Sequence, residues 1–231
     1  MRLQFGYSGV SMRRSILGLA TFFVTLAAGQ LAAQLPDEID LLPPESLQGW
    51  TRIPIPAIDG LKPKQQWRID PAQRTLICSG DGGHEWLRSD RDFGDFILTV
   101  EWRFTPRGAD EKRYNSGVGV RLSKWGEIWY QAQTGLTGGY LFGQNFTPEG
   151  LLKGFNLQKE MKENRVKPAG EWNRYEIRAE SDRLTLSVNG AVVSELTNVG
   201  LRRGYIGFEA EGYEIAFRNI RLKPLAQKTI Y

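Results

Sequence analysis

Side chains that could bind or act on a ligand alternate with glycines in two short segments of the chain. The segments are Asn115-Ser116-Gly117-Val118-Gly119-Val120-Arg121 and Glu127-Ile128-Trp129-Tyr130-Gln131-Ala132-Gln133. Successive side chains of a β-strand point to opposite faces, so Asn115 shares a face with Arg121, and Trp129 shares one with Gln131 and Gln133. Glycines between two polar groups leave an open floor where a ligand can reach the backbone. The pattern predicts a polar patch with an aromatic rim, or simply the solvated face of a half-buried sheet.

The longest strand pattern carries a carboxylate that could serve as a base. In it, Phe96, Leu98, Val100, Trp102 and Phe104 alternate with Ile97, Thr99, Glu101 and Arg103. The apolar set should face the core. Glu101 and Arg103 are then expected on the opposite face, together with Arg121 and Gln131. The alternative is an ion pair of Glu101 with Arg103 or Arg121 that only neutralises this face.

The single cysteine and the single histidine exclude several kinds of catalytic centre. Cys78 ends an apolar strand pattern and is interpreted as a small core residue, with a reactive thiol paired to His84 as the alternative. Neither an intrachain disulfide nor a zinc-type cysteine cluster can form. His84 lies in a glycine-rich turn with no nucleophile elbow nearby, which favours a surface residue over a catalytic base.

Residues 1–33 are typical of a secretory signal peptide. Arginines precede an apolar run over residues 16–28, and small residues follow it up to an expected cleavage near Ala33, with translation starting at Met1 or Met12. An uncleaved membrane anchor is the alternative, although the run is short for a span. The leader has basic but no acidic residues, which leaves the rest of the chain close to neutral. No basic stripe with interleaved aromatic residues indicates a nucleic-acid partner.

The mature chain, residues 34–231, has the length of a single domain, with its core at about 41–225. Asn189-Gly190 between two alternating runs is the strongest hairpin signal, because both turn residues need positive φ. Residues 134–170 are glycine-rich and irregular, and long loops with a helical turn near Leu157–Glu163 are expected there, as a lid or as a solvated excursion. Roughly eleven or twelve short strands and almost no helix predict an all-β sandwich of two sheets.

Seven stretches, taken in order, form a recognisable set. They are Leu47-Gln48-Gly49-Trp50, Gly83-His84-Glu85-Trp86-Leu87-Arg88-Ser89, Phe93-Gly94-Asp95-Phe96-Ile97-Leu98-Thr99-Val100-Glu101-Trp102-Arg103, Asn115-Ser116-Gly117-Val118-Gly119-Val120-Arg121, Gly170-Glu171-Trp172-Asn173-Arg174-Tyr175, Val188-Asn189-Gly190 and Phe217-Arg218-Asn219-Ile220-Arg221-Leu222-Lys223-Pro224-Leu225. The set resembles the 3-keto-disaccharide hydrolase domain, also called DUF1080, from about Leu41 to Leu225. The resemblance implies a jelly-roll sandwich of the concanavalin A-like or glucanase type. It also implies a bacterial protein exported to the periplasm or the extracellular space.

In chemical terms, the resemblance implies action on glycosides oxidised to a ketone at C3 of the sugar. The ketone acidifies the C2 proton, so that a base can remove it, the C1 substituent can leave, and water can add to the enone. Such a site needs a base, an acid, and a group or a metal ion that stabilises the enolate. A divalent cation is therefore the candidate cofactor.

Residue roles follow from this resemblance and from side-chain chemistry. The candidate catalytic residues are Glu101 or Glu211 as the base and Arg121, whose fixed fork of donors would hold the ketone or enolate oxygen. Crowding by another acid would raise the pKa of such a carboxylate toward the range that a base needs. Glu209 is a candidate metal ligand or second acid. The candidate substrate-binding residues are Asn115, Arg103, Gln131, Gln133 and Trp129.

The chain departs from the family pattern in two places. Many members have Glu and Gln where this chain has Gln131 and Gln133, and many have Gln and His where this chain has Glu209 and Glu211. Glutamine cannot act as a base at neutral pH, so Glu209 or Glu211 would have to take that role.

Two other classes of function are open at this point. A carbohydrate-binding module without turnover would use the seven tryptophans and a polar groove. A structural or interaction domain of a secreted complex would use residues 134–170 as its contact. The expected partner is a carbohydrate, and stable membrane insertion is not expected after the signal is cleaved.

Overall fold

The computed structural model describes residues 1, 4, 6, 38–108 and 110–226. Nearly all of the predicted signal segment, including its cleavage point, therefore lies outside the described residues, and that prediction stays a prediction. Within the described part, the only helix is a short 3-10 helix at Ala57–Asp59. None of its helices has the length and apolar character needed to cross a membrane.

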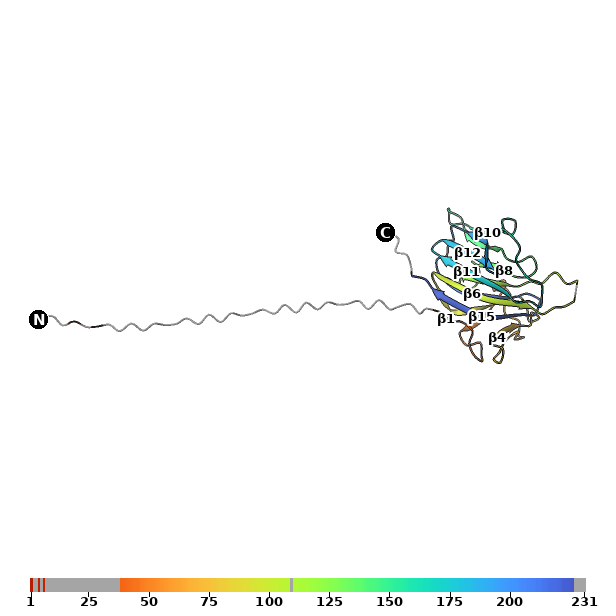
Figure 1. Ribbon diagram of the computed structural model, residues 1–231, viewed down its shortest axis with the longest axis horizontal. Helices are drawn as coiled ribbons and strands as arrows, with labels where there is room; N and C mark the ends of the chain where they lie inside the picture. The colour runs from red at the N-terminus through yellow and green to blue at the C-terminus, as the bar shows by residue number, and fades with distance from the viewer. Residues whose placement is uncertain (2–3, 5, 7–37, 109, 227–231) are drawn as a thin grey trace. The chain divides into compact units, whose positions relative to one another are not determined.

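The strands of the described residues form two antiparallel sheets, which confirms the predicted two-sheet jelly-roll sandwich. The eight-stranded sheet has the order β13 (Ala191–Leu196), β12 (Arg183–Val188), β11 (Asn173–Glu180), β6 (Phe96–Phe104), β15 (Ile215–Pro224), β4 (Thr75–Cys78) and β3 (Trp67–Asp70), with β1 (Ile39–Asp40) also pairing with β15. The seven-stranded sheet has the order β10 (Leu152–Asn156), β9 (Leu141–Phe146), β8 (Tyr130–Gln133), β7 (Gly117–Leu122), β14 (Gly204–Ala210), β5 (Glu85–Phe93) and β2 (Trp50–Pro54). Figure 1 shows the layer of the eight-stranded sheet, with β12, β11, β6, β15 and β4 side by side.

The core lies between the two sheets and follows the alternation of the sequence. On β6, the predicted apolar set is buried, and the residues between them are only partly buried. The seven-stranded sheet contributes Val118, Val120, Ala132 and Phe208 to the same core. Phe208 meets Phe217 of the other sheet with ring centroids 4.5 Å apart. Burying side chains of this size contributes about 1.5–3 kcal/mol each, which is what holds the sheets together.

Two local predictions are confirmed by backbone geometry and burial. Asn189 has φ 48° and Gly190 has φ 93°, as a tight hairpin between β12 and β13 requires. Cys78 is fully buried, and burial raises the pKa of its thiol to about 12. The thiol is thus a core group and remains protonated at neutral pH.

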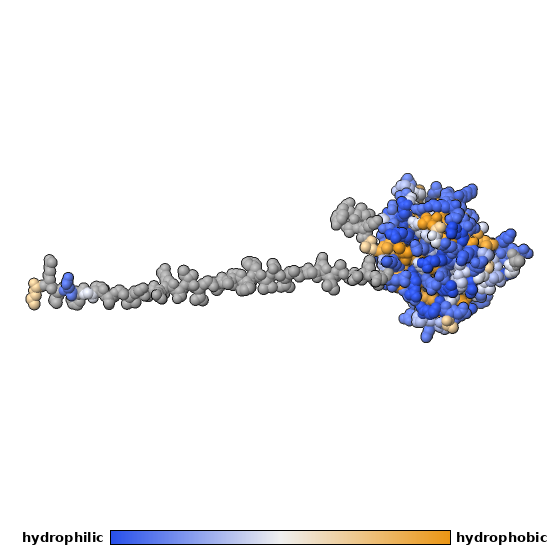
Figure 2. All heavy atoms as spheres, viewed as in Figure 1, coloured by the Kyte–Doolittle hydropathy of each residue, from blue (hydrophilic) through white to orange (hydrophobic). Residues whose placement is uncertain are grey.

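The prediction for residues 134–170 was wrong in part, because β9 and β10 form a hairpin there and no helix occurs near Leu157–Glu163. The hairpin extends the seven-stranded sheet beyond β8. Gly143 makes this pairing possible, since a Cβ there would lie 2.1 Å from the carbonyl oxygen of Trp129. The strand pattern was missed because glycine interrupts the apolar alternation. The face visible in Figure 2 is mostly hydrophilic, with apolar residues in small patches.

Candidate active site

A cavity of about 340 Å³ lies on the outer face of the seven-stranded sheet, the face turned away from the core. Its volume is at the lower end of the range for small-molecule sites, roughly 300–1,000 Å³. Strands β9, β8, β14 and β5 all contribute to it, with loop residues at the strand ends. The lining residues are Ile55, His84, Trp86, Asn115, Gly126, Trp129, Gln131, Gln133, Tyr140, Phe142, Glu209 and Glu211.

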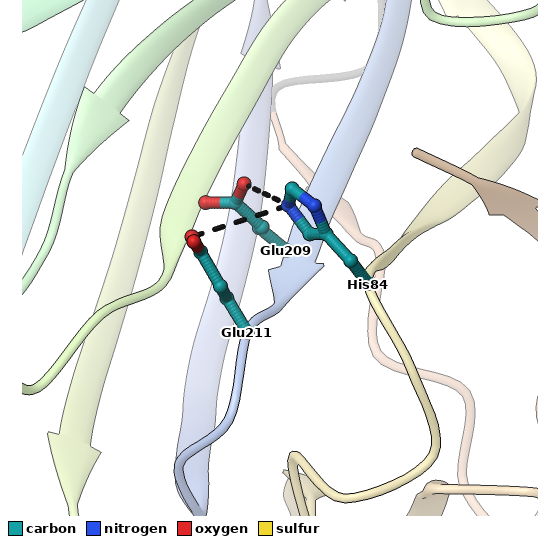
Figure 3. A group of neighbouring side chains, drawn as sticks. All are labelled: His84, Glu209 and Glu211. Atoms are coloured by element: carbon teal, nitrogen blue, oxygen red, sulfur yellow. Dashed lines mark hydrogen bonds and ion pairs between the residues drawn. The ribbon is translucent and has the colours of Figure 1, made fainter. Parts of the chain in front are cut away.

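An imidazole and two carboxylates meet at one end of this cavity (Figure 3). Nε2 of His84 lies 2.8 Å from Oε1 of Glu209 and 3.9 Å from Oε2 of Glu211. Glu209 is the second-last residue of β14 and is buried, whereas Glu211 follows the strand and is partly exposed. Both point to the same face because side chains two residues apart on a strand do so.

Side-chain amides continue from this cluster in a directional chain of hydrogen bonds. Nε2 of Gln131 donates to Oε2 of Glu209 at 2.6 Å and to Oε1 of Gln133 at 3.1 Å. Nε2 of Gln133 in turn donates to Oδ1 of Asn115 at 2.5 Å. Because an ionised carboxylate only accepts, Glu209 fixes the direction of the whole chain. The Nδ2 amide group of Asn115 is the donor end that remains for a ligand.

Aromatic rings line another side of the cavity. The ring centroids of Trp86 and Trp129 are 6.4 Å apart, those of Trp129 and Phe142 are 5.0 Å apart, and those of Phe142 and Tyr140 are 5.7 Å apart. Edge-to-face and tilted contacts of this kind keep each ring in a fixed orientation. The cavity therefore offers apolar faces beside hydrogen-bonding groups, as a sugar ring with its C–H faces and hydroxyls requires.

The position of His84 is set by the turn that precedes β5. The amide of Gln66, which is 3% exposed, donates from Nε2 to the carbonyl of Gly83 at 2.9 Å and accepts from the backbone N–H of Gly82 at 3.0 Å. Gly83 has φ 107°, which a residue with a side chain rarely adopts. The carbonyl of His84 accepts from the backbone N–H of Ile55 at 3.0 Å. Hydrogen bonds to the backbone of Gly83 and of His84 therefore fix the position from which the imidazole extends.

Electrostatics shift two groups of the cluster in the same direction for different reasons. The hydrogen bond with Glu209 raises the pKa of His84 above its usual value. Burial, followed by the charge of Glu209, raises the pKa of Glu211. A carboxylate with a raised pKa is a stronger base than an ordinary one and can act near neutral pH.

Six of the predicted site residues come together in the cavity. They are Asn115, Trp129, Gln131, Gln133, Glu209 and Glu211. The expected alternation of β8 is confirmed, because Tyr130 and Ala132 lie in the core while Gln131 and Gln133 face the cavity. The open floor expected above the glycines of β7 was wrong, since a Cβ on Gly117 would lie 2.0 Å from Nε2 of Gln131. That glycine makes room for a protein side chain.

Arg121 does not reach the cavity, so its predicted position is corrected. Its side chain is fully buried, donating to Asp95 Oδ1 at 2.8 Å and to the carbonyls of Gly94, Ser181 and Leu201. The cause is a β-bulge between β7 and β14, at which Arg121 adopts φ 47°. A bulge shifts the alternation by one residue. Leu122 follows Gly119 on the outer face instead, and its side chain packs over that glycine.

Glu101 and Arg103 also lie away from the cavity, on the other sheet. They belong to β6 in the middle of the eight-stranded sheet, where they alternate with its buried residues. Glu101 accepts from Nε of Arg218 at 2.7 Å, and Arg103 stacks over Trp172 with its guanidinium carbon 4.5 Å from the ring centroid. Glu101 does form an ion pair, but the predicted partners Arg103 and Arg121 were wrong, because Arg218 of the neighbouring strand β15 takes that place. The expectation that both share a face with Gln131 was wrong.

Sequence reasoning missed His84, Tyr140, Trp86 and Phe142. His84 is exposed, as the surface interpretation predicted, but it also lines the cavity, because β5 pairs with β14 and brings the imidazole to Glu209 across 125 residues of sequence. The signal that could have found it is the motif Gly83-His84-Glu85-Trp86, which belongs to the stretches that carry the family resemblance. Tyr140 lies in the glycine-rich segment that was expected to form loops.

The cluster of His84, Glu209 and Glu211 has the composition of a divalent-cation site. One nitrogen and two carboxylate oxygens, one from each residue, lie within 4.8 Å of one another. Imidazole with carboxylates suits ions such as Zn²⁺ and Mn²⁺. The predicted ligand Glu209 belongs to this set, and the buried amide of Gln131 would orient it from behind. The residues present therefore fit the ion that the family resemblance implies.

The β-sandwich, with an amphipathic, carboxylate-bearing cavity on one sheet, fits the class of carbohydrate-active proteins. Within this class, the chain belongs to the family of 3-keto-alpha-glucoside-1,2-lyase-like domains, whose family model matches residues 38–223. This confirms the family that the sequence motifs indicated.

Solved structures with the same fold are distant in sequence. One is a candidate glycosyl hydrolase from Parabacteroides distasonis, with 13% identity, a TM-score of 0.57, and coverage of 82% of this chain and 94% of the other. Another is the carbohydrate-binding module CBM66 from Bacillus subtilis, with 13% identity, a TM-score of 0.55, and coverage of 78% and 96%. A comparison with curated protein sequences gives no significant match.

Proposed function

We propose that this protein eliminates the C1 substituent from glycosides that carry a ketone at C3 and hydrates the resulting enone. The observation that carries the proposal is the position of Glu211, a carboxylate with a raised pKa, beside His84 and Glu209 in the cavity. Aromatic side chains line the same cavity. Membership of the lyase-like family supports the same reaction class. The base is now assigned to Glu211, because Glu101 lies on the other sheet.

In the first step, Glu211 takes the proton from C2, and the electron pair of the C2–H bond forms an enolate with the C3 ketone. The C1–O bond then breaks, its electron pair leaves with the substituent oxygen, and a C1=C2 double bond remains. Addition of water returns a hydroxyl to C1 and a proton to C2. The sum is a 3-keto-glycoside plus water giving a 3-keto sugar plus an alcohol. A positioned base of this kind contributes about 10²–10⁴-fold to the rate.

The enolate oxygen needs donors, and the amide chain supplies one. The Nδ2 group of Asn115 is its donor end, and the described residues contain no acceptor bound to it. Gln131 and Gln133 hold Asn115 in that orientation from below. Preorganised donors aimed at developing charge stabilise a transition state without reorganisation.

Where a divalent cation is bound, His84 and Glu209 would hold it, and Glu211 beside them would remain the base. Its chemistry would be that of a Lewis acid that polarises the ketone. The residues of the chain would still exclude water, orient the sugar on the aromatic wall and hold the amide donors in place.

A carbohydrate-binding module without turnover is the second candidate function. One observation favours it, namely the similarity of the fold to a carbohydrate-binding module. The amphipathic cavity would serve such a module as well, because an apolar wall and amide groups are sufficient to bind a sugar.

Incubation with 3-ketosucrose or 3-ketotrehalose tests the proposal. The expected result is release of the second sugar and an enone that absorbs in the ultraviolet, with the unoxidised disaccharide as the matched control that stays intact. Binding in calorimetry without product would support the module instead. If neither binding nor product is observed, an interaction domain is the remaining function. Export to the periplasm or beyond remains part of the proposal, and the N-terminus of the protein purified from its native cells would test it.

A further inference from the structure

The proposed elimination moves two protons at different places on the sugar. One leaves C2, and another must reach the oxygen that departs from C1, because an alkoxide is a poor leaving group. His84, Glu209 and Glu211 lie within 4.8 Å of one another, so they form a single acid–base centre at one end of the cavity. A proton donor outside this cluster would let the acid and the base approach the sugar from separate sides.

Among the residues that line the cavity, Tyr140 is the one remaining group with an ionisable proton. It lies just before β9, whereas the carboxylates belong to β14 and the turn after it. Strands β8 and β7 stand between these two strands in the sheet. Three strand spacings amount to about 14 Å between the backbones, so the phenol and Glu211 face the cavity from opposite sides.

The hydroxyl of Tyr140 differs from those of the other buried tyrosines in the described part of the chain. Tyr130 donates to Oδ1 of Asn145 at 2.8 Å, Tyr175 donates to the carbonyl of Gln133, and the hydroxyl of Tyr114 accepts from the backbone N–H of Arg107 at 2.7 Å. Tyr140 is only 9% exposed, and no described residue forms a hydrogen bond with its hydroxyl. Buried tyrosine hydroxyls usually have a partner. The hydroxyl of Tyr140 is not among the described side-chain atoms that are fully buried and unpaired, so it is accessible from the cavity, and a ligand there can be its partner.

The backbone and ring of Tyr140 are fixed by the site itself. Its carbonyl accepts from the backbone N–H of Gln133 at 3.0 Å, and its ring packs against Phe142. Burial raises the pKa of Tyr140, which keeps the phenol protonated at neutral pH. The phenol of Tyr140 is thus a proton donor in a fixed position.

We propose that Tyr140 is the general acid that protonates the oxygen departing from C1, an inference that rests on the proposed function. As the C1–O bond breaks, its electron pair goes to the oxygen, which takes the phenolic proton. The C2 proton has gone to Glu211, and solvent returns a proton to the phenolate. Acid catalysis matters most where the leaving group is a weak acid.

The leaving-group dependence of a Tyr140→Phe variant tests this assignment. Two 3-keto-glucosides are compared, one with a methyl and one with a 4-nitrophenyl aglycone. On the methyl substrate, kcat should fall by about 10²–10⁴-fold, whereas on the nitrophenyl substrate it should change only a few-fold. A Tyr205→Phe variant, which changes a tyrosine on the same sheet outside the cavity lining, should leave both rates unchanged.

Each other outcome has a definite meaning. Equal losses on both substrates, or full activity on the methyl substrate, would overturn the role of Tyr140 while the proposed function stands. Failure of the wild-type protein to convert either substrate would overturn both. If Tyr140→Phe melts well below the wild type, the variant is replaced as a test by wild-type rates on a series of aglycones. A steep slope of these rates against the aglycone pKa would contradict assistance by an acid.

Discussion

Gln131 and Glu209 form a buried amide–carboxylate pair in which Nε2 donates to Oε2 at 2.6 Å. The two positions lie 78 residues apart in the sequence. The family resemblance implies Glu at position 131 and Gln at position 209 in many members. On that implication the two departures are one reciprocal exchange, and the pair keeps one acid and one amide.

Exchanging the two residues should test whether the pair acts as a unit. Gln131→Glu alone places two carboxylates in contact and should cost roughly 1–3 kcal/mol of stability as well as turnover, because the buried hydrogen bond is lost. Adding Glu209→Gln should restore a large part of both. The measurements are urea unfolding and kcat on a 3-keto-glycoside. A double variant that is as impaired as the sum of the single ones would contradict a shared role.

Arg121→Ala should destabilise the fold. The guanidinium is fully buried, and its removal leaves three carbonyls without this donor and leaves the Asp95 carboxylate with only the backbone N–H of Ser181. Breaking one partner of a buried ion pair typically costs about 3–5 kcal/mol. Arg103→Ala on the outer face of β6 is the matched control and should cost less than about 1 kcal/mol. A wild-type melting temperature with lost turnover would instead return Arg121 to the catalytic role.

Glu211→Gln and Glu101→Gln should separate the two candidate bases. The amide at position 211 cannot take a proton, so turnover should fall by about 10²–10⁴-fold. The variant at 101 loses only an ion pair with Arg218 on the other sheet and should keep wild-type kcat. Initial rates on 3-ketotrehalose measure both. Full activity of Glu211→Gln would show that the base is another residue.

Divalent cations should act through His84, the single histidine of the chain. Its imidazole signals in a two-dimensional NMR spectrum therefore need no assignment. Addition of Zn²⁺ to protein treated with EDTA should shift these signals and stop their titration between pH 5 and 8, because a metal-bound nitrogen cannot take a proton. In a Glu209→Gln/Glu211→Gln variant, the shift should need much more Zn²⁺. Unchanged imidazole signals at saturating Zn²⁺ would exclude this cluster as the site.

Local alternation was sufficient to predict most of the fold. The burial of Phe96, Leu98 and Val100 on β6 follows from a period of two, and the hairpin at Asn189-Gly190 follows from the φ angles of its turn. The same period placed Gln131 and Gln133 on one face of β8. These features depend on residues within a few positions of one another, which is why the sequence alone determined them.

The composition of the cavity depended on contacts that no local pattern contains. The pairing of β5 with β14 brought His84 to Glu209, and the position of β6 in the other sheet removed Glu101. At the bulge, Arg121 adopts a positive φ, so its side chain points into the interior and Leu122 lies on the outer face. Strand order and bulges are set by long-range packing of the two sheets, so the tertiary structure alone decided which side chains share the site.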